Sequence, residues 1–111
     1  MTITRHQQEE VLILAPGKKL TFSETGDELS EAVRQALEEG IRKFLFDFSA
    51  VEFIDSLGVG QIVSSYTSIK KKEGHLVLCG LQPRIALVLR MVNLHFVLDI
   101  KDGGPGEVIW T

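Results

Sequence analysis

Short apolar runs alternate with amphipathic stretches along the chain. Residues 11–15, 44–48 and 75–79 form nearly continuous runs of branched, aliphatic and aromatic side chains. A run of this length that is apolar at almost every position is typical of a strand buried on both faces. Weaker alternation over residues 2–8 predicts an edge strand, and residues 98–100 predict a short last strand.

Two amphipathic stretches separate the three apolar runs. The first follows Thr25, whose spacing to Glu28 predicts a capping box, and Gly40 is expected to end it. The second follows residue 58 and ends near Gly74. The apolar faces are expected to be Leu29, Val33, Ala36, Leu37 and Ile41 in the first helix, and Val59, Ile62, Val63, Tyr66 and Ile69 in the second.

A third helix is predicted from Pro83, which suits a first helical position. Its apolar stripe is wide, because Leu87, Met91 and Leu94 extend the row of Ile85, Val88, Leu89 and Val92. Core packing explains most of this stripe. The alternative for the remainder is an exposed patch for a partner or for self-association.

The predicted order β-β-α-β-α-β-α-β indicates an α/β fold. Strands that alternate with helices form βαβ units, so we expect a mostly parallel sheet of about four or five strands, covered by about three or four helices. The 111 residues suit one domain, for which we expect residues 1–102, followed by a C-terminal tail at 103–111 that starts at a Gly/Pro cluster.

Composition narrows the classes of function. The net charge of −3 gives no basic excess for nucleic acid, so no nucleic-acid partner is expected. We expect no secretory signal, because residues 1–6 contain no apolar h-region. We expect no membrane insertion, because no apolar run approaches the ~20 residues of a membrane span. Cys79 is the only cysteine and lies in an apolar run, which predicts a buried, inert thiol in a cytoplasmic protein.

Motifs for enzyme chemistry are missing from the sequence. There is no phosphate-binding Gly-x-x-x-x-Gly-Lys-Ser/Thr loop, and Gly58-Val59-Gly60 lacks the third glycine of a dinucleotide fingerprint because Val63 stands there. The three histidines are scattered, without metal-ligand spacing. We therefore expect no metal, no cofactor and no catalytic residue, hence no enzyme.

The segment from Asp55 to Gly60 is the main candidate for function. It lies between an apolar strand and the start of a helix, where ligands and modifications gather in parallel sheets. A phosphate on Ser56 would meet the first helical N–H groups. Gly58 and Gly60 would leave room for another protein's backbone. The alternative is structural, with Asp55 or Ser56 serving only as the helix N-cap.

Residues 44–60 closely resemble the core of the STAS domain, which sulphate transporters and anti-sigma-factor antagonists share. The family pattern is an apolar strand, an apolar turn, and Asp-Ser-x-Gly opening a helix, here Asp55-Ser56-Leu57-Gly58. The likeness continues through residues 74–80 and 83–85 and spans roughly residues 3–102.

This resemblance implies an anti-sigma-factor antagonist, a binding protein without enzymatic activity. In bacterial members, the serine after the aspartate is phosphorylated by the cognate anti-sigma factor, which is also a kinase, and a phosphatase resets it. Ser56 holds that position, and Asp55 would shape its pocket. The unphosphorylated protein would bind the kinase and so release a sigma factor.

Two departures from the family pattern lie at this site. Leu57 replaces the second Ser or Thr of many antagonists, which leaves Ser56 as the single acceptor and adds apolar surface. In the loop expected beside the site, Lys18 and Lys19 precede Leu20, and Thr21 replaces an aspartate. The two lysines would either stabilise a phosphate or bind a different partner.

Three rival functions remain open from the sequence. The first is a STAS subunit of a membrane lipid or anion transport system, docked on a cytosolic ATPase. The second is a component of a large stress-signalling assembly, and the third is a small enzyme or nucleotide-binding domain. A weak homodimer is a further expectation for the chain itself.

Overall fold

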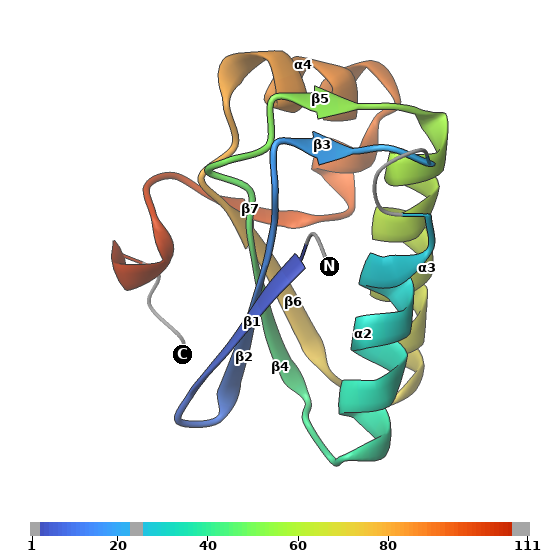
Figure 1. Cartoon of the computed structure of the whole chain (residues 1–111), viewed down its shortest axis with the longest axis vertical. Helices are drawn as coiled ribbons and strands as arrows, with labels where there is room; N and C mark the ends of the chain where they lie inside the picture. Colours follow the sequence, from blue (N-terminus) through green and yellow to red (C-terminus); the bar gives the residue numbers. More distant parts are fainter. Residues whose placement is uncertain (1–2, 23–25, 108–111) are drawn as a thin grey trace.

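The main sheet has five strands in the order β1-β2-β4-β6-β7 (Figure 1). The computed structural model describes residues 3–22 and 26–107. The strands are β1 (Ile3–Gln8), β2 (Val11–Pro16), β4 (Lys43–Asp47), β6 (His75–Cys79) and β7 (Asp99–Lys101). β1 pairs with β2 antiparallel at one edge, and all other pairs in this sheet are parallel. The predicted, mostly parallel sheet with an N-terminal edge strand is confirmed.

Three α-helices occur in the described residues: α2 (Glu28–Glu38), α3 (Ser56–Lys71) and α4 (Pro83–Met91). α2 and α3 lie side by side along the sheet (Figure 1), and short 3-10 helices follow at η1 (Leu94–Phe96) and η2 (Pro105–Glu107). The predicted end of the first helix is confirmed, because α2 stops just before Gly40, whose φ is +95°.

A second sheet of two short parallel strands was not predicted. β3 (Lys19–Leu20) pairs with β5 (Phe53–Ile54), and both cross the end of the main sheet near α4 (Figure 1). Because β5 ends directly before α3, this small sheet brings the segment after β2 to the beginning of that helix.

The two faces of the main sheet bury different sets of side chains. Leu12, Phe44 and Leu78 belong to the large core that also takes in side chains of all three helices. Alternate positions on the same strands, Ile13, Leu45 and Val77, form a row in register on the other face. Burial on both faces explains why the central strands β2, β4 and β6 are largely apolar, whereas the edge strand β1 is polar and exposed after Ile3.

The predicted apolar face of α3 is partly wrong. Val63 is 40 % exposed, whereas Gln61 and Ser65 are buried. The Oε1 atom of Gln61 accepts hydrogen bonds from the backbone N–H groups of Leu29 (2.9 Å) and Ser30 (3.4 Å). A polar residue is needed there because the first N–H groups of a helix lack partners within the helix.

The capping box predicted from Thr25 to Glu28 falls partly outside the described residues, so it stays a prediction. The N-cap residue of α2 is Asp27, whose side chain makes no capping hydrogen bond. Thr25, which was expected to form the box, lies outside the described residues. The Gln61 side chain of α3 accepts hydrogen bonds from this start of α2 and so helps to hold it.

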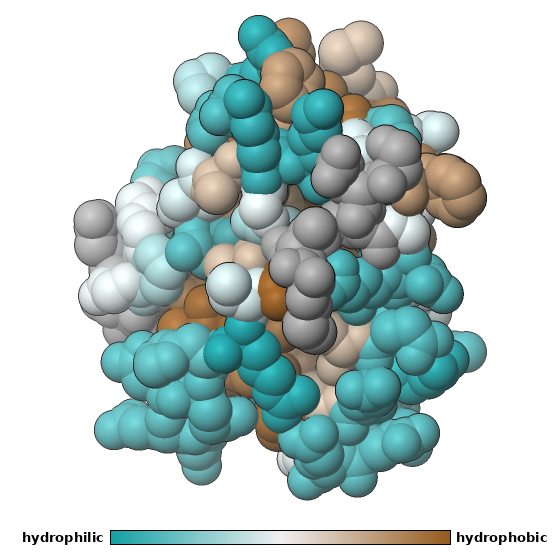
Figure 2. Space-filling view, in the orientation of Figure 1, coloured by the Kyte–Doolittle hydropathy of each residue, from teal (hydrophilic) through white to brown (hydrophobic). Residues whose placement is uncertain are grey.

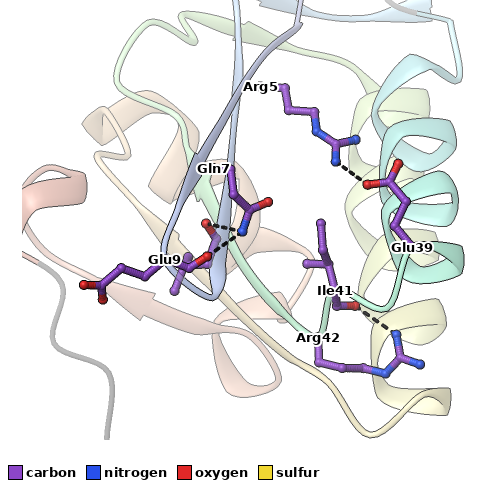
Figure 3. A network of polar contacts seen from close by, with 7 residues as sticks. Arg5, Gln7, Glu9, Glu39, Ile41 and Arg42 are labelled. Carbon is purple, nitrogen blue, oxygen red and sulfur yellow. Dashed lines mark hydrogen bonds and ion pairs between the residues drawn. The ribbon is translucent and has the colours of Figure 1, made fainter.

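Exposed polar contacts tie the edge strand to its neighbours (Figure 3). Arg5 Nη2 of β1 lies 2.6 Å from Glu39 Oε1 at the end of α2, and Gln7 Nε2 donates to the Glu9 carbonyl in the hairpin (2.8 Å). Exposed ion pairs contribute under about 1 kcal/mol each, so the backbone ladder with β2 does most to hold β1.

The apolar stripe predicted on α4 lies partly in the core and partly at the surface. Ile85 and Leu89 are fully buried. A set of apolar residues on α4 and just after it is exposed: Leu87, Met91, Val92, Phe96 and Val97. Part of the predicted stripe is therefore at the surface, and its use by a partner or in self-association stays a prediction.

The segment expected as a C-terminal tail lies partly against the second face of the sheet. Pro105 and Gly106 line a hollow of about 120 Å³ together with Ile13 and Leu45. Residues 108–111 lie outside the described part. None of the helices in residues 3–22 and 26–107 is long and apolar enough to cross a membrane.

Candidate functional site

Asp55 joins the two-stranded sheet to the start of α3. It is the N-cap residue, and its Oδ1 accepts a hydrogen bond from the Gly58 N–H (2.8 Å). Its Oδ2 accepts from the Phe22 N–H (3.1 Å), 33 residues earlier in the chain. These bonds favour the charged carboxylate, and the one from Gly58, followed by the one from Phe22, lowers the pKa of Asp55 below its ordinary value of 3.8. The cap is thus Asp55 and not Ser56.

Ser56 is the first residue of α3, and it is exposed. Its hydroxyl makes no hydrogen bond with any residue that the structure describes. Because Asp55 already serves the cap, this hydroxyl has no structural task in the folded chain. It can therefore meet another molecule without any loss of internal contacts.

The β3 segment lies beside this site, as the sequence predicted. The Lys18 carbonyl accepts hydrogen bonds from the N–H groups of Glu52 (2.8 Å) and Phe53 (3.1 Å). Lys19 pairs with Phe53 in the parallel ladder, and the half-buried Thr21 leads into Phe22. Both lysine side chains are exposed and form no ion pair with the described part of the chain.

The two glycines of the motif have different surroundings. A Cβ atom on Gly58 would overlap the Leu20 carbonyl oxygen and lie 2.8 Å from Ile54 Cγ1. Gly58 therefore lets β3 and α3 approach each other, which replaces the explanation that it makes room for a partner's backbone. A Cβ atom on Gly60 would meet nothing within 4 Å, so no internal contact requires that glycine.

A groove of about 470 Å³ opens next to Ser56, between the first turns of α2 and α3. Its walls include Phe22 and Leu57, which are 65 % and 52 % exposed. The face shown in Figure 2 is hydrophilic over the β1–β2 hairpin and the end of α2, and hydrophobic residues gather over α4 and the beginning of α3.

The sequence analysis did not assign Phe22 to the site. The only feature of the sequence that could have indicated it is an aromatic residue in a polar loop.

Arg84 is a second residue that sequence reasoning did not place here. Its guanidinium group, in the first turn of α4, lies 5.5 Å from the centroid of the Phe53 ring. The contact is a cation–π interaction, and it adds a third cation near Lys18 and Lys19.

Among the described residues, no cluster of three His, Cys, Asp or Glu side chains could hold a metal ion.

Comparison with known proteins identifies relatives over nearly the whole chain. The family model of the STAS domain matches residues 2–103. A protein of Thermotoga neapolitana, whose name proposes an anti-sigma factor antagonist, is 32 % identical over 94 residues, or 85 % of this chain and 83 % of that protein. The crystal structure of a Thermotoga maritima protein with the same proposed role has a TM-score of 0.85 at 27 % identity, covering 95 % of this chain and 89 % of that one.

The anti-sigma factor antagonist SpoIIAA of Bacillus has the same fold. Its unphosphorylated form gives a TM-score of 0.76 and its phosphorylated form 0.75, both at 18 % identity. Each match covers 95 % of this chain, and 92 % and 94 % of those chains. The predicted fold class is confirmed by these structures.

Proposed function

Because the chain belongs to the STAS domain family, we propose that it is an anti-sigma factor antagonist whose binding is switched off by phosphorylation of Ser56. The names of the Thermotoga relatives and of SpoIIAA support the class of partner. The protein acts by binding and catalyses no reaction itself. Since sigma factors act on RNA polymerase, the proposal implies a cytoplasmic protein.

The observation that carries the proposal is the state of the Ser56 hydroxyl. It is exposed and makes no hydrogen bond with the described residues, while the neighbouring Asp55 serves as the N-cap. A kinase needs a hydroxyl that can reach its active site without unfolding the substrate. Ser56 meets this condition in the folded chain.

Phosphorylation would change the charge of this surface sharply. A phosphoserine carries about −1.5 to −2 charges at pH 7, next to the ionised Asp55. The flanking Leu57 and Phe22 are exposed apolar side chains. A partner that covers them would also have to remove water from the phosphate, which is costly for a charged group. The modified protein therefore loses its partner, whereas the unmodified protein binds.

We propose that the kinase is the cognate anti-sigma factor itself and that a separate phosphatase removes the phosphate. Lys18, which precedes β3, Lys19 of β3 and Arg84 are exposed cations around Phe53, and we propose that they form a positive rim. Such a rim attracts an acidic partner surface and speeds encounter more than it tightens the complex.

The test is intact-mass spectrometry of the chain isolated from its native cells. Wild type should carry a single added phosphate, and Ser56→Ala should carry none. Thr67→Ala is the matched control, because Thr67 is an exposed hydroxyl on the same helix. If wild type carries no phosphate under any growth condition, the switch is refuted and docking on a transporter ATPase becomes the better hypothesis.

A further inference from the structure

The groove beside Ser56 has a composition that suits an apolar guest. Phe22 and Leu57 form its walls, and the hydroxyls of Ser30 and Ser64 supply part of its polar surface. Asp27 is the one charged residue among the described lining residues, so no cation is available there to hold an anion. Large exposed apolar side chains around a hollow mark an interaction site more often than a bare surface does.

Gly60 leaves the groove open, although a glycine lowers the stability of the helix that carries it. Glycine inside a helix is less favourable than alanine by roughly 0.5–1 kcal/mol. Gly60 lies on α3, lines the groove, and has free space where a Cβ would stand. No contact within the described chain needs this glycine, so the open space is free to receive another molecule.

The groove is continuous with the proposed binding surface. Leu57 directly follows the phosphoacceptor, and the Phe22 backbone is bonded to the Asp55 carboxylate. A molecule that covers Ser56 would therefore also cover the mouth of the groove. Side chains that dominate binding energy usually enter such pockets near the centre of an interface.

We propose that this groove receives an apolar side chain of the anti-sigma factor, and that Phe22, Leu57 and the open position at Gly60 select which anti-sigma factor binds. The inference rests on the proposed function and adds the chemistry of the partner's contact residue. It also gives the exposed Leu57 side chain a role, because a leucine at this position extends the apolar wall.

The test uses each anti-sigma-factor kinase encoded by the genome that encodes this chain, purified singly and titrated by calorimetry. Ser64→Leu fills the groove from α3, and Phe22→Ala removes a wall. Thr67→Leu is the matched control, because it adds a leucine one turn further along the same exposed helix but does not line the groove. Melting temperatures of the free variants show that each is folded.

We expect one kinase to bind wild type and the Thr67→Leu variant equally. Ser64→Leu and Phe22→Ala should each weaken that binding by at least about tenfold, as expected for losing one buried apolar side chain. Equal binding by wild type and all three variants would overturn the groove proposal but leave the proposed function intact.

Two other results would also overturn the inference. If no kinase binds wild type, the proposed function fails and the groove proposal fails with it. A dimer of this chain that Ser64→Leu breaks would instead show that a second copy fills the groove, which sedimentation of the free proteins detects.

Discussion

Replacing Gly58 by alanine tests whether β3 is packed against α3 through this glycine. The added Cβ atom would overlap the Leu20 carbonyl oxygen and come within 2.8 Å of Ile54 Cγ1. The first of these is a backbone atom, held by the β3–β5 ladder, so it cannot turn aside as a flexible side chain would. Either β3 or the first turn of α3 must move.

The magnitude follows from two opposing terms. Overpacking of a well-packed interior costs about 1–3 kcal/mol. The better helix propensity of alanine offsets this cost by up to about 1 kcal/mol in the free energy of unfolding. The net loss of about 1–2 kcal/mol should lower the melting temperature by roughly 5–15 °C in a domain of this size. Gly60→Ala has only the favourable term, because its Cβ meets nothing within 4 Å, and should raise the melting temperature by a few degrees.

Thermal unfolding followed by circular dichroism at 222 nm measures both variants, and urea titration gives the free energies independently. The pair is matched, since both substitutions add one methyl group to the same helix two residues apart. If Gly58→Ala melts at or above the wild-type temperature, the close approach of β3 to α3 is refuted.

Three further predictions concern charges and the thiol. Lys18→Glu combined with Lys19→Glu should slow partner association or phosphorylation of Ser56 about tenfold at low salt and less at high salt; rates equal to wild type at both salt concentrations would exclude a role for these lysines. The pKa of Asp55 is lowered from 3.8, so its carboxylate stabilises the fold fully above about pH 3.8, and this contribution is lost as the pH falls through the lowered folded pKa. Asp55→Asn should therefore be less stable than wild type at pH 7. Urea titrations should find that the difference in free energy of unfolding between the two proteins narrows below about pH 4; a difference that stays constant to pH 2 would contradict a stabilising role of the Asp55 carboxylate. Burial, and after it the charge of Asp47, raises the pKa of the Cys79 thiol to about 11, so a disulfide reagent at pH 8 should label it only after unfolding in guanidinium, and prompt labelling of the native protein would speak against this.

The centre of the main sheet could be predicted from sequence because β2, β4 and β6 are buried on both faces. The row of Ile13, Leu45 and Val77 on the second face keeps the runs of these three strands nearly continuous in apolar residues. The β3–β5 sheet was not predictable in the same way, since two strands of two residues have no measurable period. Its existence depends on backbone hydrogen bonds, such as those to the Lys18 carbonyl, that no side-chain pattern records.

The buried face of α3 was partly missed because hydrophobic periodicity considers apolar residues alone. It takes no account of the N–H groups of the neighbouring helix that need a hydrogen-bond acceptor. Gln61 is buried to satisfy the N–H groups of α2, and Val63 is left at the surface. At the site, the motif alone indicated Ser56 and Asp55. Phe22 could not be found, because its place depends on the second carboxylate oxygen of Asp55 reaching back 33 residues.

The attachment of β3 has a consequence for engineering. This segment is held to the rest of the molecule by the buried Leu20 side chain and by main-chain atoms: the Lys18 carbonyl, the Phe22 amide and the ladder with β5. Its exposed side chains therefore contribute little to its position, and the lysines can be exchanged without losing the register. The lysine positions can therefore be exchanged between STAS proteins without disturbing the part of the groove that Leu57 and Gly60 form on α3.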